Sequence, residues 1–424
     1  MTMEHENRKR LTRRGFLGVG TATTLVLAGC LGDGDDGDDG DDTEETNDTD
    51  SPGDQNGDPP ETLPVVENPP DEVYYPTHRE AFRVLPTVEA GDYVVLPHFT
   101  YPHRFWLMRG GETEEVVPTV EDSMHLMLAV WDRETGQVLP VGDGTELVIE
   151  QDGEVVERLP PWPMVSQEMG FHFGDNVPLP GDGSYTVEVT LPPLDDTVRK
   201  TGAFEGRFTE TVTATFDLDY SEQDRVALLE GVEFLDEELW GEPGALELMD
   251  HSDHDHGHGD DETHGDDHSD GHGGDDHDDG HGDHGDGDSH DNESAMPSLA
   301  LPPADEYPGT DLGTSTSGGA AFVVRYVEDS HLSDGDEGYL LVSPRTPHNR
   351  IPLPDMALSI TVGDGQELTQ TLDHELGLHY GASVTLAPGE EFDLVVESPP
   401  QVARHQGYET AFVEMPLMTV EVPE

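Results

Sequence analysis

Histidine and methionine recur in this sequence at spacings that suit a metal centre. In EDSMHLMLAVWD, alternation along a strand puts His125 and Met127 on one face and their apolar neighbours on the other. A second segment, PPWPMVSQEMGFHFGDN, holds Met164 and His172 in what reads as a proline- and glycine-rich connection. Imidazole with thioether suits copper or another late first-row metal. Since methionine also fills cores and buried histidine is often simply hydrogen-bonded, the residue types alone leave both interpretations open.

The densest histidine segment runs from Met249 to Asp291, with eleven of the 22 histidines and neither lysine nor arginine. It has almost no apolar residue to bury and cannot offset the entropy of ordering, so we predict a disordered linker over 249–297. Flexible aspartate and histidine bind transition metals weakly, and the alternative is an acidic spacer with incidental histidines. The histidines of this tract are His251, His254, His256, His258, His264, His268, His272, His277, His281, His284 and His290.

The N-terminus predicts export and lipid attachment. Arg13 and Arg14 form a twin-arginine pair before an apolar run that is too short to span a membrane. The run ends in LAGC, which resembles a lipobox whose Cys30 is the only cysteine of the chain. We expect a signal over 1–29 and an extracytoplasmic protein anchored to the cell membrane by lipid on Cys30. An uncleaved anchor with an incidental cysteine is the alternative.

The chain is strongly acidic, with a formal net charge of -74. The tether expected over 30–68 and the histidine tract hold only part of the 93 acidic residues, so the folded parts are acidic too. Such self-repulsion is tolerated where salt screens it, which indicates a halophilic archaeon. Nucleic acid is excluded as a partner on the same grounds.

Short strands separated by glycine, proline and aspartate turns predict an all-β fold. SYTVEVTL and TVTATFDL alternate with period two, as in an antiparallel sandwich with one wet face per sheet. Ser221 and Asp224 then form a capping-box pattern before a helical run. We predict two immunoglobulin-like β-sandwich domains joined by a short helix and a disordered His/Asp-rich linker. The boundaries are 69–220 for the metal-binding sandwich, 221–248 for the helical segment, 249–297 for the linker and 298–424 for the second sandwich.

The second sandwich reads as a degenerate repeat of the first. FHFGDNVPLPGDGSYTVEVTLPP and LHYGASVTLAPGEEFDLVVESPP align without a gap from His172 and His379 onward. Further on, TGAFEGRF aligns with HQGYETAF, which begins at His405. Two sandwiches that share only turn chemistry are the alternative.

PMVSQEMGFHFGDNVPLPGDGSYTVEVTL resembles the signature of the periplasmic ferrous-iron-transport lipoprotein family of bacteria. MHLMLAVWD resembles the strand of that family that carries a His-Leu-Glu. The resemblance covers roughly Gly91 to Tyr220. It implies an immunoglobulin-like sandwich that usually dimerises, binds copper or a similar divalent ion, and assists iron uptake beside a membrane permease. Carried over by position, the metal ligands would be His125, Met164 and His172.

The chain departs from the family pattern at several positions. Met127 stands where the family has a glutamate, and the family's late histidine is missing from the first sandwich. His405 occupies that place in the second sandwich, which has Tyr339 and its neighbours where the first has His125. Either His405 completes a site in an intrachain pseudo-dimer, or the second sandwich is a structural copy. A homodimer is also compatible with the family.

These observations predict an extracytoplasmic metal-binding protein that serves iron or copper acquisition next to a membrane permease. The alternative is a surface structural or adhesion lipoprotein with incidental metal binding. We expect no enzyme, because nucleophile elbow, HExxH and phosphate-loop motifs are missing from the sequence. The ion would be a divalent transition metal, copper or iron ahead of zinc. The candidate ligands are His125, Met127, Met164 and His172, then His379 and His405, with His98 and His103 as alternatives.

Overall fold

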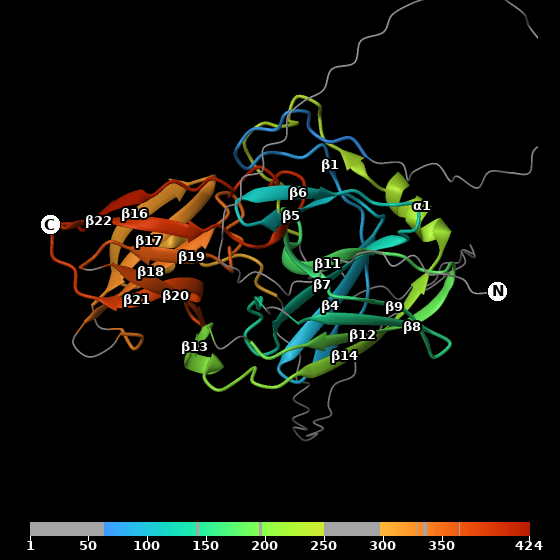
Figure 1. Cartoon of the computed structure of the whole chain (residues 1–424), viewed down its shortest axis with the longest axis horizontal. Helices are drawn as coiled ribbons and strands as arrows, with labels where there is room; N and C mark the ends of the chain where they lie inside the picture. Colours follow the sequence, from blue (N-terminus) through green and yellow to red (C-terminus); the bar gives the residue numbers. More distant parts are fainter. Residues whose placement is uncertain are drawn as a thin grey trace, which may run out of the picture. The chain divides into compact units, whose positions relative to one another are not determined.

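The computed structural model describes residues 63–140, 144–194, 197–249, 297–328, 330–333, 337–363 and 365–424. The export signal, Cys30, the acidic tether and the histidine tract lie outside these residues, so those predictions are not tested here. The described residues belong to one compact unit. Their regular secondary structure is almost all β-strand, which confirms the predicted all-β class (Figure 1). Among them, no helix combines the length and apolarity that a membrane span requires.

The first sandwich has a large and a small sheet. In spatial order, the large sheet contains β2 (Arg83–Val84), β4 (Tyr93–Thr100), β7 (Met124–Asp132), β11 (Gly170–Val177), β10 (Trp162–Ser166), β23 (Ala403–Arg404), β5 (Phe105–Arg109) and β6 (Glu112–Val116), with β3 (Val88–Ala90) paired to β4. The small sheet contains β14 (Val212–Tyr220), β12 (Gly183–Leu191), β8 (Glu146–Gln151) and β9 (Glu154–Leu159).

Alternation along the strands explains how these two sheets enclose a core. On β12, Tyr185, Val187 and Val189 are buried, whereas Thr186 and Glu188 between them are exposed, as the period-two pattern predicts. The large sheet differs, because β4 and β7 are buried along their whole length. Chain segments from both ends of the sequence cover its outer face, so the expectation of one wet face per sheet holds only for the small sheet.

The second sandwich repeats this strand order. Its strands, in spatial order, are β16 (Thr310–Ser317), β17 (Ala320–Val327), β18 (Gly338–Arg345), β21 (Gly377–Val384), β20 (Gln366–Asp373), β19 (Ala357–Ile360), β22 (Glu391–Ser398) and β24 (Met418–Glu421), with β13 (Arg199–Thr201) paired to β20. The order β17-β18-β21-β20 corresponds to β4-β7-β11-β10 of the first sandwich. One half of β20 pairs with β21 and the other half with β19, so this strand joins the two layers.

Each sandwich donates a short strand to the sheet of the other. Strand β23 follows the second sandwich's β22, yet it pairs in parallel with β10 at Met164↔Ala403 and Val165↔Arg404. Strand β13 leaves the first sandwich and pairs in parallel with β20, with Arg199 opposite Thr371. Figure 1 shows the green β13 beside the orange β20. A single apolar core cluster accordingly contains residues of both sandwiches.

The helix α1 is shorter than the sequence predicts. Its predicted capping box is confirmed, since the Ser221 side chain accepts a hydrogen bond from the Asp224 backbone N–H, and the Asp224 carboxylate accepts one from the Ser221 backbone N–H. The helix spans Glu222–Glu230 and does not continue to residue 248. Gly231 follows, and the chain then forms β15 (Glu233–Phe234), which pairs with β1 (His78–Arg79). Strand pairing with a distant segment therefore overrides the local helical pattern. Two 3-10 turns complete the described elements, η1 (Gly202–Phe204) and η3 (Ala304–Glu306).

We predict that the first sandwich is incomplete when the second is removed. A chain of residues 63–249 lacks β23 and exposes the facing edges of β10 and β5, and such edges associate with other chains. Light scattering in high salt should show association or aggregation, and residues 297–424 added in trans should restore a 1:1 complex. The control is the chain with only 250–296 replaced by a short linker, which keeps β23. A stable monomer of 63–249 with the full chain's denaturation midpoint would contradict the exchange of strands.

Candidate metal centre

Four histidine rings meet on the outer face of the large sheet. His125 lies on β7, His172 on β11, His103 in the loop before β5, and His405 directly after β23. Ligand nitrogens of His103, His125 and His405 all lie within 4.8 Å of one another. The His172 ring stands 5.1 Å from that of His405, centroid to centroid. The second sandwich therefore supplies one ring of the cluster, and the first supplies three.

Backbone hydrogen bonds orient two of these rings. His172 Nδ1 lies 3.1 Å from the Gly170 carbonyl oxygen, and His103 Nδ1 lies 2.9 Å from the carbonyl oxygen of Arg104. A carbonyl oxygen only accepts, so each Nδ1 carries the proton and each Nε2 keeps its lone pair. Metal-ligating histidines are commonly held in this way, with the second ring nitrogen donating to an oxygen.

Asn176 fixes the third ring. Its amide nitrogen donates to the backbone oxygen of His103 over 2.9 Å, and its Oδ1 accepts from the backbone N–H of the same residue over 3.3 Å. This orientation turns Oδ1 toward His125 Nδ1, 3.0 Å away. His125 Nδ1 must therefore donate, which leaves its Nε2 with a lone pair. Asn176 thus couples the loop that carries His103 to the strand that carries His125.

The Nε2 atoms of His103, His125, His172 and His405 are all buried without a hydrogen-bond partner in the described structure. A buried acceptor left unsatisfied costs about 1–3 kcal/mol, so four at one place need an explanation. Burial lowers the pKa of His103 to about 4 and the pKa of both His125 and His172 well below the usual value. The three rings are neutral at pH 7, which is the form that binds metal ions.

Met164 contributes a thioether beside these rings. The sequence placed Met164 and His172 in an irregular connection, but they lie directly opposite each other on the paired strands β10 and β11. Gly174, two residues beyond His172, leaves a space there. A Cβ on Gly174 would lie 2.9 Å from His125 Nε2 and 3.2 Å from Met164 Sδ. His125 Nε2 and Met164 Sδ can therefore lie side by side against the Gly174 backbone only because this residue has no side chain. A donor set of imidazole nitrogens and one sulfur fits a late first-row metal.

Met127 and His98 lie further along the same face. Met127 is fully buried two residues after His125 on β7, and its cross-strand neighbours are His98 on β4 and Gly174 on β11. His98 directs Nδ1 to the Leu96 carbonyl oxygen over 3.2 Å. The alternation that put Met127 with His125 is confirmed, but the tight three-histidine group forms with His103 instead of His98.

His379 occupies the same register position in the second sandwich and has a different surrounding. Its Nδ1 lies 3.1 Å from the Gly377 carbonyl oxygen, just as His172 contacts Gly170. Its Nε2, however, lies 3.1 Å from the Tyr339 hydroxyl. Tyr339 in turn lies 3.4 Å from Thr371, which stands opposite His379 as Met164 stands opposite His172. Protein hydrogen bonds therefore fill the space around His379, and it does not join the cluster.

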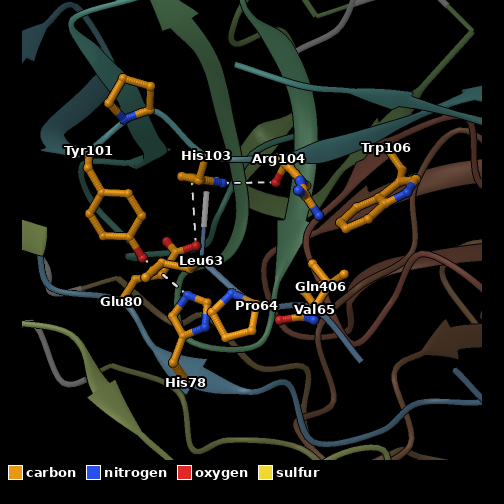
Figure 2. Close-up of a pocket in the computed structure, with 11 residues that line it drawn as sticks. Leu63, Pro64, Val65, His78, Glu80, Tyr101, His103, Arg104, Trp106 and Gln406 are labelled. Atoms are coloured by element: carbon orange, nitrogen blue, oxygen red, sulfur yellow. Dashed lines mark hydrogen bonds and ion pairs between the residues drawn. The ribbon is translucent and has the colours of Figure 1, made fainter. Parts of the chain in front are cut away.

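Glu80 is a neighbour of the cluster that the sequence did not reveal. Its Oε1 lies 3.7 Å from His103 Nε2 and 3.8 Å from His405 Nδ1. Burial raises the pKa of this carboxyl, but the surrounding imidazoles outweigh that effect and hold the pKa below its usual value. Figure 2 shows Glu80 beside His103 in a pocket that His78 and Tyr101 also line. In a chain with 93 acidic residues, nothing in the local sequence distinguishes this one.

Two small cavities reach the cluster from either side of Glu80. One is lined by His103, Trp106 and the segment 63–65, and the other by His405 and Glu168. Each offers about 40 Å³, which is room for a few water molecules. Each cavity is therefore bordered by the Glu80 carboxylate and by one ring of the cluster.

Buried His379 in the second sandwich should make the stability of the fold depend on pH. Burial lowers the pKa of His379 to about 4, against about 6.5 in an unfolded chain. Between these values the unfolded state binds the extra proton, so the free energy of unfolding falls as the pH drops, by up to about 1.4 kcal/mol per unit. His379→Gln keeps an acceptor for Tyr339 and should weaken this pH dependence. Metal-free denaturation at pH 7.5 and pH 5 would show it. The control is the exposed His348→Gln, and identical pH dependence in all three proteins would contradict the prediction.

Comparison with known proteins finds two family models that each match part of the chain. Residues 134–222 match the model of a family described as Fe2+ transport protein. Residues 305–421 match a domain of unknown function, DUF7350. No curated protein matches the chain. Among solved structures, FetP of uropathogenic E. coli strain F11 is 15% identical, with 34% of this chain and 96% of that chain covered and a TM-score of 0.23. Residues 134–222, which carry Met164 and His172, therefore match the Fe2+ transport protein family, as the resemblance of their motifs indicated.

Proposed function

We propose that the chain is an extracytoplasmic, lipid-anchored carrier that binds one divalent transition metal ion and assists its uptake by a membrane permease. The observation that carries this proposal is the cluster of four adjacent histidine rings whose buried Nε2 atoms have no hydrogen-bond partner among the described residues. The family match over residues 134–222 supports iron transport as the setting. A carrier needs no catalytic group, and the proposal assigns none.

The donor atoms suggest which ions are held. His103, His125, His172 and His405 would bind through Nε2, with Met164 Sδ beside His125. Imidazole suits iron, copper and zinc, whereas a thioether adds preference for softer ions such as copper. Calcium and magnesium need several oxygen ligands, which this set does not supply. Iron and copper are therefore the proposed cargo, ahead of zinc.

We also propose that the two sandwiches of one chain form an intrachain pseudo-dimer. The second sandwich repeats the strand order of the first, exchanges a strand with it, and delivers His405 to the cluster. In a homodimer, each subunit would deliver a ring equivalent to His405 to the cluster of its partner. In this chain only the first sandwich carries a histidine cluster among the described residues. At the corresponding position of the second sandwich, the Tyr339 hydroxyl contacts His379 Nε2 instead.

The histidine tract is proposed to collect ions for this centre. Its flanking residues meet at the turn between β10 and β11, the strands that carry Met164 and His172. The Met249 N–H donates to the Glu168 oxygen over 2.8 Å, and Leu299 packs close to Gly170. Both ends of the tract are thus attached next to the cavity that Glu168 and His405 line.

The two related histidines provide a matched test of the metal centre. In the soluble chain without residues 250–296, we expect about one tightly bound ion. His172→Gln should weaken binding by at least about 100-fold, because a ligand is lost, whereas His379→Gln should leave it unchanged. Competition against chelators in high salt, followed by metal analysis, measures both. Equal binding by the parent and His172→Gln would reject the centre and favour a structural lipoprotein.

The tract should affect the supply of ions and leave the tight site intact. We expect its removal to abolish weak binding, which fades below about pH 6 as imidazoles protonate, and to slow loading of the centre at limiting metal. The control replaces all eleven tract histidines by glutamine and keeps the aspartates. Stopped-flow loading of the intact, deleted and substituted chains would separate the contributions. Equal loading rates in all three would show that the tract is only a spacer.

A further inference from the structure

Among the residues that the structure describes, Glu80 is the carboxylate that lies against the histidine cluster. Within the described residues, its Oε1 lies 3.7 Å from His103 Nε2 and 3.8 Å from His405 Nδ1, one ring from each sandwich. It comes from the N-terminal segment and lies outside the part that matches the Fe2+ transport family. Its side chain is 17% exposed, so water screens its charge only weakly.

The backbone around Glu80 holds the carboxylate in place. The Glu80 N–H donates to Glu168 Oε2 over 3.2 Å, and the Glu168 Oε1 accepts from Arg79 over 3.1 Å. Arg79 itself pairs with Glu233 in the two-stranded sheet of β1 and β15. Among the described residues, the Glu80 carboxylate has no ion pair with arginine or lysine, so its charge remains available to an ion beside the imidazoles.

The charge of the centre follows from this arrangement. The imidazoles and the thioether are neutral donors, so they do not offset the charge of an ion taken out of water. One carboxylate at this distance attracts a divalent ion twice as strongly as a monovalent ion. It brings a bound divalent ion to a net charge of one, and a bound monovalent ion to zero. Removing it should therefore cost a divalent ion more.

We infer that Glu80 is a specificity-determining residue that shifts the centre toward divalent ions over monovalent copper. The inference rests on the proposed function, because it assigns a role within the same metal centre. It explains why a buried carboxylate lies at the junction of the two cavities that lead to the cluster. It also gives a physical reason for a carrier rich in neutral donors to accept ferrous iron.

The test compares two ions on the same folded protein. Zinc(II) and copper(I) would be titrated anaerobically against chromogenic chelators, in a high concentration of sulfate salt. Glu80→Gln should weaken zinc(II) binding by on the order of 100-fold and copper(I) binding by only about tenfold. Glu80→Asp keeps the charge and should keep most of the preference. Glu115→Gln, which removes an exposed carboxylate from β6, should change neither affinity.

The outcomes separate this inference from the proposed function. Equal losses for both ions, or no loss for either, would overturn the role of Glu80 and leave the centre intact. If the parent chain binds neither ion tightly, the proposed function fails and the inference fails with it. Should Glu80→Gln not fold, Glu80→Ser removes the same charge and gives the same ratio of affinities.

Discussion

The parallel pairing of β23 with β10 is the interaction on which the proposed centre depends. It aligns Ala403 with Met164 and Arg404 with Val165, and the His405 N–H then donates to the Val165 oxygen over 3.1 Å. These contacts place His405 over the face that carries His125 and His172. Arg404 secures the strand from the other side, since its buried guanidinium donates to the Phe412 oxygen over 3.1 Å and lies 5.7 Å from the ring centre of Phe412. A shift of β23 by one residue would turn His405 away from the cluster.

The two sandwiches show how one scaffold supports two outcomes. His172 and His379 share a strand position and the same hydrogen bond to a backbone oxygen two residues earlier. In the second sandwich the Tyr339 hydroxyl lies within hydrogen-bond distance of both His379 Nε2 and the Thr371 hydroxyl. In the first sandwich four rings converge and leave their Nε2 atoms without partners. The difference lies in a few side chains, and the backbone is common to both.

Features that depend on local periodicity, such as strand faces and the start of a helix, could be predicted from the sequence. Alternation identified the face shared by His125 and Met127, and the capping box identified where α1 begins. Interactions between distant segments were not predictable in this way. The exchanged strands are two and three residues long, and β23 pairs with a strand more than 200 residues earlier, so no local pattern reveals them. Glu80 was missed for the same reason, because only the folded chain brings it to His103.

The central claim is that ligands from both sandwiches hold one ion, and anomalous diffraction from crystals of the metal-loaded soluble chain tests it most directly. The account predicts one strong anomalous peak per chain, enclosed by the Nε2 atoms of His103, His125, His172 and His405, with Met164 Sδ close by. A peak held by residues of the first sandwich alone would contradict the role of the second. A loaded crystal with no peak among these rings would contradict the metal centre itself.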